Sequence, residues 1–170
     1  MKVFKVLLAV CLGLIAGVNL TVAQNYIAVA KDGNVYDESN AKYITLNQTN
    51  DEVAVIPGMV FATTEHTPGW YKVEYSPGLH AFIPDQIVAS NFKEIQPGSY
   101  DIKNNAGKKL NVEGSGDNWN ATIDGNSFKG VKWEDILLFM DGNNQIAYSV
   151  LDLGNGPIAI TYDNSITKFF

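Results

Sequence analysis

The side chains that could do chemistry in this 170-residue chain are few. There are two histidines, His66 and His80, and a single cysteine, Cys11. Two histidines without a further thiol or a patterned carboxylate do not make a metal site, so we expect both in surface loops and predict no metal or cofactor. Nucleophile-elbow, phosphate-loop and His-Glu-x-x-His strings are also absent. These features favour a binding protein over an enzyme.

Two acidic patterns could instead bind a metal ion or catalyse hydrolysis. The string from Asp141 to Gln145 places oxygen ligands as at the start of a calcium loop. Ile146 stands where such a loop requires glycine, and Asp152 where it requires glutamate, so a hairpin turn is favoured. The 18 Asp and Glu residues could include an acid pair for glycoside cleavage. None of these carboxylates has a setting that suggests a raised pKa. A hydrolase is therefore the third of three hypotheses, after a binding module and a protein-interaction subunit.

An aromatic residue is the best candidate for a binding site. In the run that begins at Trp70, side chains alternate, so Tyr71 and Val73 share one face of a strand. Trp70 shares the other face with Lys72 and Glu74, and two charges predict that this face meets water. Trp70 would then be partly exposed beside a Pro-Gly bend, where a ligand can stack on it. The alternative is that Trp70 packs against a second domain or a long loop.

The elements that must position these residues are short strands. The triplet Asp-Gly-Asn starts at Asp32, Asp124 and Asp141, and such triplets favour hairpin turns. Gly154-Asn155-Gly156 is a fourth candidate turn. Short alternating or β-rich runs lie between the turns, and this spacing predicts an all-β fold of small antiparallel sheets or barrels. The predicted strands include residues 70–75, 81–88, 119–124, 136–140, 146–151 and 157–162.

Residues 1–23 have the pattern of a secretory signal peptide. Lys2 and Lys5 precede an apolar run over residues 6–18, and small residues follow it, so Gln24 would begin the mature chain. The run is shorter than the roughly 20 residues that span a bilayer, which argues against a permanent anchor. We therefore expect an exported protein, periplasmic or secreted, with no membrane span after signal cleavage.

Cleavage changes the chemistry of the chain. A lipid-bearing role for Cys11 is disfavoured because the branched Val10 stands where lipidation sites need a small residue, so the mature chain has no cysteine. It keeps 10 of the 12 cations, all of them lysine, against 18 acidic residues, a net charge of −8. An acidic chain without arginine is a poor partner for nucleic acid. It is also a poor partner for polyanions of the cell envelope.

A Pro-Gly break at residues 97–98 follows a completed set of strands. We therefore expect a domain over residues 24–93 and an antiparallel β meander or small barrel over residues 94–170. Phe169–Phe170 is expected to dock a last strand. The predicted core of the second domain is Tyr100, Ile102, Leu110, Val112, Ile123, Phe128, Val131, Ile136, Leu138, Ile146, Tyr148, Val150, Ile158, Ile160 and Tyr162.

Four segments of the first domain follow one another as in a known family. They are Ala28-Val29-Ala30 with Gly33-Asn34-Val35-Tyr36, Pro57–Phe61, Gly69-Trp70-Tyr71-Lys72-Val73, and Ala81–Val88 with its aromatic-Ile-Pro run. In this order they resemble bacterial SH3-like (SH3b) domains. The resemblance implies a small barrel whose ligand groove contains Trp70, in a protein that binds the cell wall. Two departures are Ile87, which replaces a groove tyrosine used for Pro-x-x-Pro peptides, and the long loop over residues 37–56.

The sequence therefore predicts an exported, non-catalytic binding module. Its SH3-like groove would hold a cell-envelope peptide or glycan of the peptidoglycan type, with a neutral glycan or a basic peptide stem suiting the acidic chain. Trp70 would stack the ligand, with Tyr36, Tyr71 and His80 as neighbours. The alternative is a structural or protein-interaction subunit of an envelope or secreted complex, in which sheet edges or the Asn-rich loop contact another exported protein.

Overall fold

The computed structural model describes residues 25–162, except for residues 39–41, 44, 47–50, 53 and 77–78. The predicted signal peptide and Phe169–Phe170 lie outside the described residues. Within them the chain is all-β, with one short 3-10 turn and no α-helix, so the predicted fold class is confirmed.

The first half of the chain forms a six-stranded antiparallel sheet with the order β1-β8-β9-β10-β3-β4. Two short ladders, β2–β7 and β5–β6, and the 3-10 turn η1 complete this half. The elements are β1 (Asn25–Ala28), β2 (Gly33–Asn34), β3 (Tyr36–Glu38), β4 (Lys42–Tyr43), β5 (Thr45–Leu46), β6 (Asp51–Glu52), β7 (Ala54–Val55), β8 (Val60–Thr67), β9 (Trp70–Ser76), β10 (Leu79–Pro84) and η1 (Asp85–Ile87).

The second half is a seven-stranded meander in which every strand pairs with its neighbour in the chain. A parallel bridge between Ile102 and Ala159 brings its first and last strands together, so the sheet closes almost completely into a barrel. The strands are β11 (Gly98–Asp101), β12 (Lys109–Ser115), β13 (Asn118–Ile123), β14 (Asn126–Trp133), β15 (Ile136–Met140), β16 (Ile146–Asp152) and β17 (Pro157–Thr161).

Three of the four predicted turns connect neighbouring strands. Asp124 and Gly125 have φ angles of 48° and 81° and connect β13 to β14 in a two-residue turn. One carboxylate oxygen of Asp141 accepts the amides of Asn143 and Gln145, so this string forms a turn between β15 and β16. Asp152 accepts two amides in the same way in the turn before β17.

The triplet at Asp32 is different. Gly33 and Asn34 form strand β2 and pair with β7, so the prediction of a hairpin turn there is wrong. A Cβ atom on Gly33 would lie 2.6 Å from Cδ1 of Ile87. The side chain of Ile87 in η1 therefore packs closely against Gly33, and a larger residue there would need this side chain to shift.

The interior of each sheet is filled by apolar side chains. The first core includes Val35, Val73 and Ile83, and the second fills the barrel with residues such as Leu110, Trp119 and Phe139. Gly130 is buried against Trp119, so strict alternation along β14 turns Val131 outward. Val131 is 50% exposed, and its prediction as a core residue is wrong.

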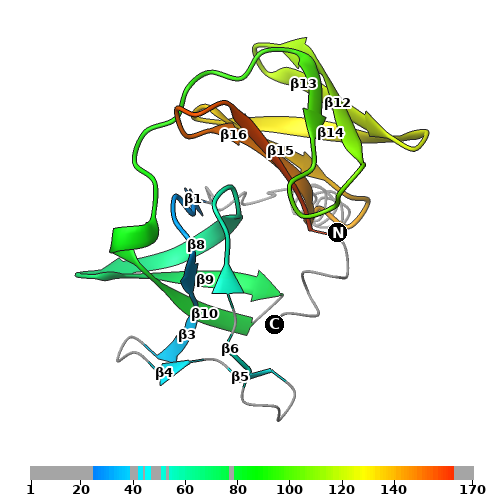
Figure 1. Cartoon of the computed structure of the whole chain (residues 1–170). Coiled ribbons are helices and arrows are strands. Elements are labelled where there is room, and N and C mark those ends of the chain that lie inside the picture. The colour runs from blue at the N-terminus through cyan, green and yellow to red at the C-terminus, as the bar shows by residue number, and fades with distance from the viewer. Residues whose placement is uncertain are drawn as a thin grey trace, which may run out of the picture.

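A third core joins the two halves. Ala28 and Val60 of the first sheet pack with buried side chains on the outside of the barrel, namely Ile136, Leu138 and Leu151. Figure 1 shows the barrel lying across the first sheet, with residues 88–97 running along one side between them. The two sheets therefore pack on each other as one body.

Candidate functional site

The register of β9 and β10 decides which candidate residues share a face. Directly opposed residues in an antiparallel pair point to the same side of the sheet. The opposed pairs are Trp70–Pro84, Lys72–Phe82 and Glu74–His80, and Phe82 in turn faces Tyr36 of β3. Trp70, Tyr36 and His80 therefore lie on one face, which we call the outer face of the first sheet.

Trp70 and Tyr36 are in direct contact on the outer face. Their ring centroids lie 5.1 Å apart with the rings at 80°, which is an edge-to-face pair. Each side chain is partly exposed. Trp70 thus has the intermediate exposure that the strand alternation predicts, and its ring is supported by Tyr36.

The other two candidates have different surroundings. Tyr71 points to the opposite face of β9, where it packs against the first core and stacks on His66 with centroids 4.2 Å apart. His80 is exposed and lies opposite Glu74. The structure brings Trp70, Tyr36 and His80 to one face and places Tyr71 apart from them.

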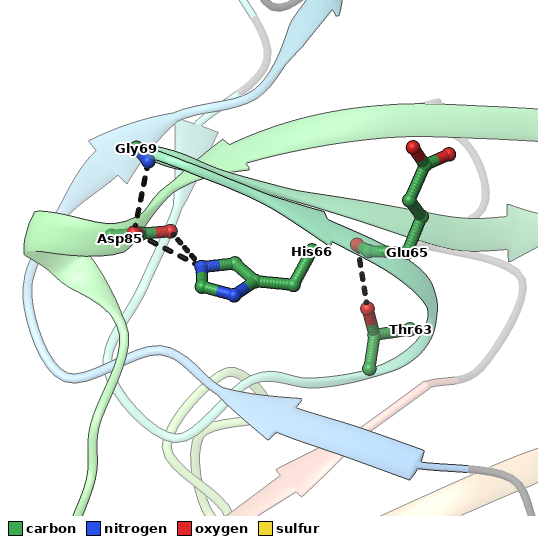
Figure 2. Close-up of polar contacts among 5 residues, drawn as sticks. All are labelled: Thr63, Glu65, His66, Gly69 and Asp85. Carbon is green, nitrogen blue, oxygen red and sulfur yellow. Dashed lines mark hydrogen bonds and ion pairs between the residues drawn. The ribbon is translucent and has the colours of Figure 1, made fainter.

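The turn that precedes Trp70 is held by a carboxylate. Both oxygens of Asp85 lie 3.1 Å from Nε2 of His66, and Oδ2 also accepts the backbone amide of Gly69 at 3.1 Å (Figure 2). Within the described residues, the His66 ring bonds to this carboxylate and to no hydroxyl or thiol. The contacts are those of a clamp that fixes the β8–β9 turn and with it the position of Trp70.

The contact between His66 and Asp85 was not predicted from the sequence. His66 lies in β8 and His80 in β10, so the expectation that both are loop residues is wrong, although both are exposed. His66 and Asp85 are separated by 19 positions, and no short motif joins them. The predicted strand over residues 81–88 ends at Pro84 in the structure, and the carboxylate directly after the Ile-Pro dipeptide was the available signal.

The described residues lack two further features. No three His, Cys, Asp or Glu side chains gather there in an arrangement that could hold a metal ion. None of the helical segments described is long and apolar enough to cross a membrane.

Comparison with family models, curated proteins and solved structures found no match to this chain.

Proposed function

We propose that this chain is an exported, non-catalytic binding module that holds a peptide or glycan of the cell envelope on the outer face of its first sheet. The observation that carries the proposal is the edge-to-face pair of Trp70 and Tyr36, both partly exposed. The SH3b-like order of segments in the sequence adds the expectation of a cell-wall ligand.

The pair is suited to binding because it is held in place before a ligand arrives. Tyr36 supports one side of the indole, and the Asp85 clamp fixes the amide of Gly69 directly before Trp70. A site whose side chains are already ordered loses less conformational entropy on binding. An aromatic surface of this kind packs against the C–H face of a sugar or against a proline or aliphatic side chain.

The charges around the pair bear on the ligand class. Lys72, Glu74 and His80 flank the aromatic residues on the same face, so the local charge is mixed. The whole chain carries a net charge of −6, which repels polyanions. A neutral glycan or a peptide with basic groups is therefore the favoured ligand.

A second candidate function is that of a protein-interaction subunit. The third core makes the two sheets one body that could present a continuous surface to another protein. Val131, half exposed on the outside of the barrel, would then lie within that contact surface. In this case Trp70 contributes little to binding.

Retention on insoluble peptidoglycan separates the two candidates. We expect Trp70→Ala to reduce the retained fraction of the full chain at least tenfold, because the stacking surface is removed. Tyr36→Ala should have a smaller effect in the same direction. Val131→Ala is the matched control, since it truncates an exposed apolar side chain on the barrel. Unchanged retention of a folded Trp70→Ala protein, verified by circular dichroism, would exclude the outer face as the binding site.

A further inference from the structure

A second concave surface lies between the two sheets, away from the outer face. It is an open cleft of about 490 Å³, lined by β1, β8, β9, residues 88–92 and the turn between β14 and β15. Its lining includes Tyr71 but not Trp70, Tyr36 or His80. A ligand in this cleft would therefore use different side chains from one on the outer face.

Aromatic side chains from both halves of the chain line this cleft. Tyr26, His66 and Tyr71 come from the first sheet, and Phe92 and Trp133 from the linking segment and the barrel. Tyr26 and Trp133 meet edge to face with centroids 5.7 Å apart, and His66 stacks on Tyr71. Each aromatic pair is thus already ordered by a ring-ring contact.

Most of the polar side chains that line the cleft are uncharged. Asn25, Thr64 and Ser90 are exposed residues of the lining that carry an amide or a hydroxyl. Among the described residues, the acidic members of the lining are Glu65 and Glu134, and no lysine belongs to it. Figure 2 shows the Glu65 side chain pointing away from His66, and Glu65 lies opposite Lys72 of the outer face, so Glu134 is the lining carboxylate that does not belong to that face.

This combination selects a class of ligand. A phosphate or carboxylate would meet no cation in the lining apart from a protonated His66. A strongly basic group would find one exposed glutamate. A lipid tail would leave the amide and hydroxyl groups without partners. A sugar ring has an apolar C–H face that packs on aromatic side chains and hydroxyls that bond to amides and hydroxyls at its edge.

We propose that the cleft between the two sheets binds a neutral pyranose ring of a glycan, at a site independent of Trp70. The two sides of the cleft are fixed relative to each other by the third core, which contains Ala28 of β1 and Ile136 at the start of β15. His66 is held by Asp85, so its ring is ordered without a ligand. The cleft is consequently formed in advance, as sites for small molecules usually are.

The test uses the full chain and soluble neutral trisaccharides, namely triacetylchitotriose, cellotriose and maltotriose, titrated by calorimetry and by tryptophan fluorescence. We expect saturable binding of at least one trisaccharide. Ser90→Trp fills the cleft from its exposed rim and should weaken that binding about tenfold or more. His66→Ala should weaken it to a lesser degree. Ser127→Trp, which makes the same change at an exposed serine of the barrel outside the cleft, should leave it unchanged.

The possible outcomes separate this site from the outer face. Loss of trisaccharide binding in a folded Ser90→Trp protein, with binding kept in Trp70→Ala, supports the cleft whatever happens to peptidoglycan retention. Loss in Trp70→Ala with binding kept in Ser90→Trp overturns the cleft and leaves the proposed function intact. The cleft proposal also fails when no trisaccharide binds, or when the acidic trigalacturonate binds more tightly than the neutral panel.

Discussion

Asp85 and His66, 19 positions apart in the chain, lie with both carboxylate oxygens 3.1 Å from Nε2 of the imidazole. One of these oxygens also accepts the amide of Gly69, so a single carboxylate connects the end of β10 to β8 and to the turn before Trp70. The outer face and the cleft share this support, because Trp70 lies on one side of it and His66 on the other.

Asp85→Ala should therefore loosen the β8–β9 turn. Charge-assisted hydrogen bonds are stronger than neutral ones, but the Asp85 side chain is 38% exposed, so we expect a loss of about 1 kcal/mol in the free energy of unfolding. His66→Ala should cost less, because the Gly69 amide keeps its acceptor. Urea denaturation of both single variants and the double variant measures the coupling. Strictly additive losses would contradict a shared clamp.

Local patterns in the sequence predicted much of this fold. The strands around Trp70 and from Ile136 to Met140, and the turns at Asp124 and Asp141, follow from alternation and from residues that accept turn geometry. The partial exposure of Trp70 follows from its two charged neighbours on the same face. These features depend on residues close together in the chain, so a single sequence contains them.

Features that depend on distant residues could not be predicted. The His66–Asp85 clamp, the cleft and the third core each join segments whose approach is set by the packing of the two sheets. The positions of Val131 and Gly33 within their strands also depend on residues far away in the sequence. Val131 points outward because Gly130 is buried against Trp119, and Gly33 is a strand residue because it pairs with Val55 of β7.

Leu138→Ala should destabilise the whole chain, because Leu138 is fully buried in the core shared by both sheets. Truncation of a buried leucine leaves a cavity and typically costs 2–5 kcal/mol, so we expect a loss of about 3 kcal/mol in the free energy of unfolding. Val131 lies directly opposite on β14 and is 50% exposed, so Val131→Ala is the matched control and should cost below about 1 kcal/mol. Circular dichroism during urea denaturation should show one transition for Leu138→Ala. Two separate transitions would show that the sheets unfold independently.

Tyr162→Phe should break a buried polar contact between the halves. The Tyr162 hydroxyl accepts the Val60 amide at 2.5 Å and lies 2.9 Å from Oγ of Ser149, which in turn bonds to the Gly58 carbonyl. Without the hydroxyl, the Val60 amide loses its partner in a dry setting. We expect a loss of about 1–3 kcal/mol by urea denaturation. If the urea concentration at the midpoint and the dependence of the unfolding free energy on urea are both unchanged, another group or a water replaces the hydroxyl.

The same tyrosine should make the protein sensitive to alkali. Burial raises the pKa of Tyr162 above its ordinary value of 10.0, because the phenolate would be poorly solvated. Above pH 10 the unfolded chain releases this proton while the folded chain keeps it, so stability falls as pH rises. The slope is about 1.4 kcal/mol per pH unit for one proton. Tyr26 and Tyr100, whose pKa values are also raised by burial, add to it. Urea denaturation between pH 9 and 11 should show that the free energy of unfolding falls less steeply with pH in Tyr162→Phe than in the unmodified chain. Equal pH dependences would assign the effect to the other tyrosines.

Gly130→Ala should disturb the packing inside the barrel. A Cβ atom at this position would lie 2.7 Å from Cε1 of Phe139 and 2.7 Å from Cβ of Trp119, closer than carbon atoms can approach. Phe139 is fully buried and Trp119 nearly so, and neither can move without displacing its neighbours. Overpacking of this kind costs about 1–3 kcal/mol, which urea denaturation would measure. Gly142→Ala is the control, because nothing lies within 4 Å of its added methyl group. An equal effect of the two substitutions would contradict close contact between β13, β14 and β15 around Gly130. A large effect of Gly130→Ala alone, with an altered near-ultraviolet signal, would support it.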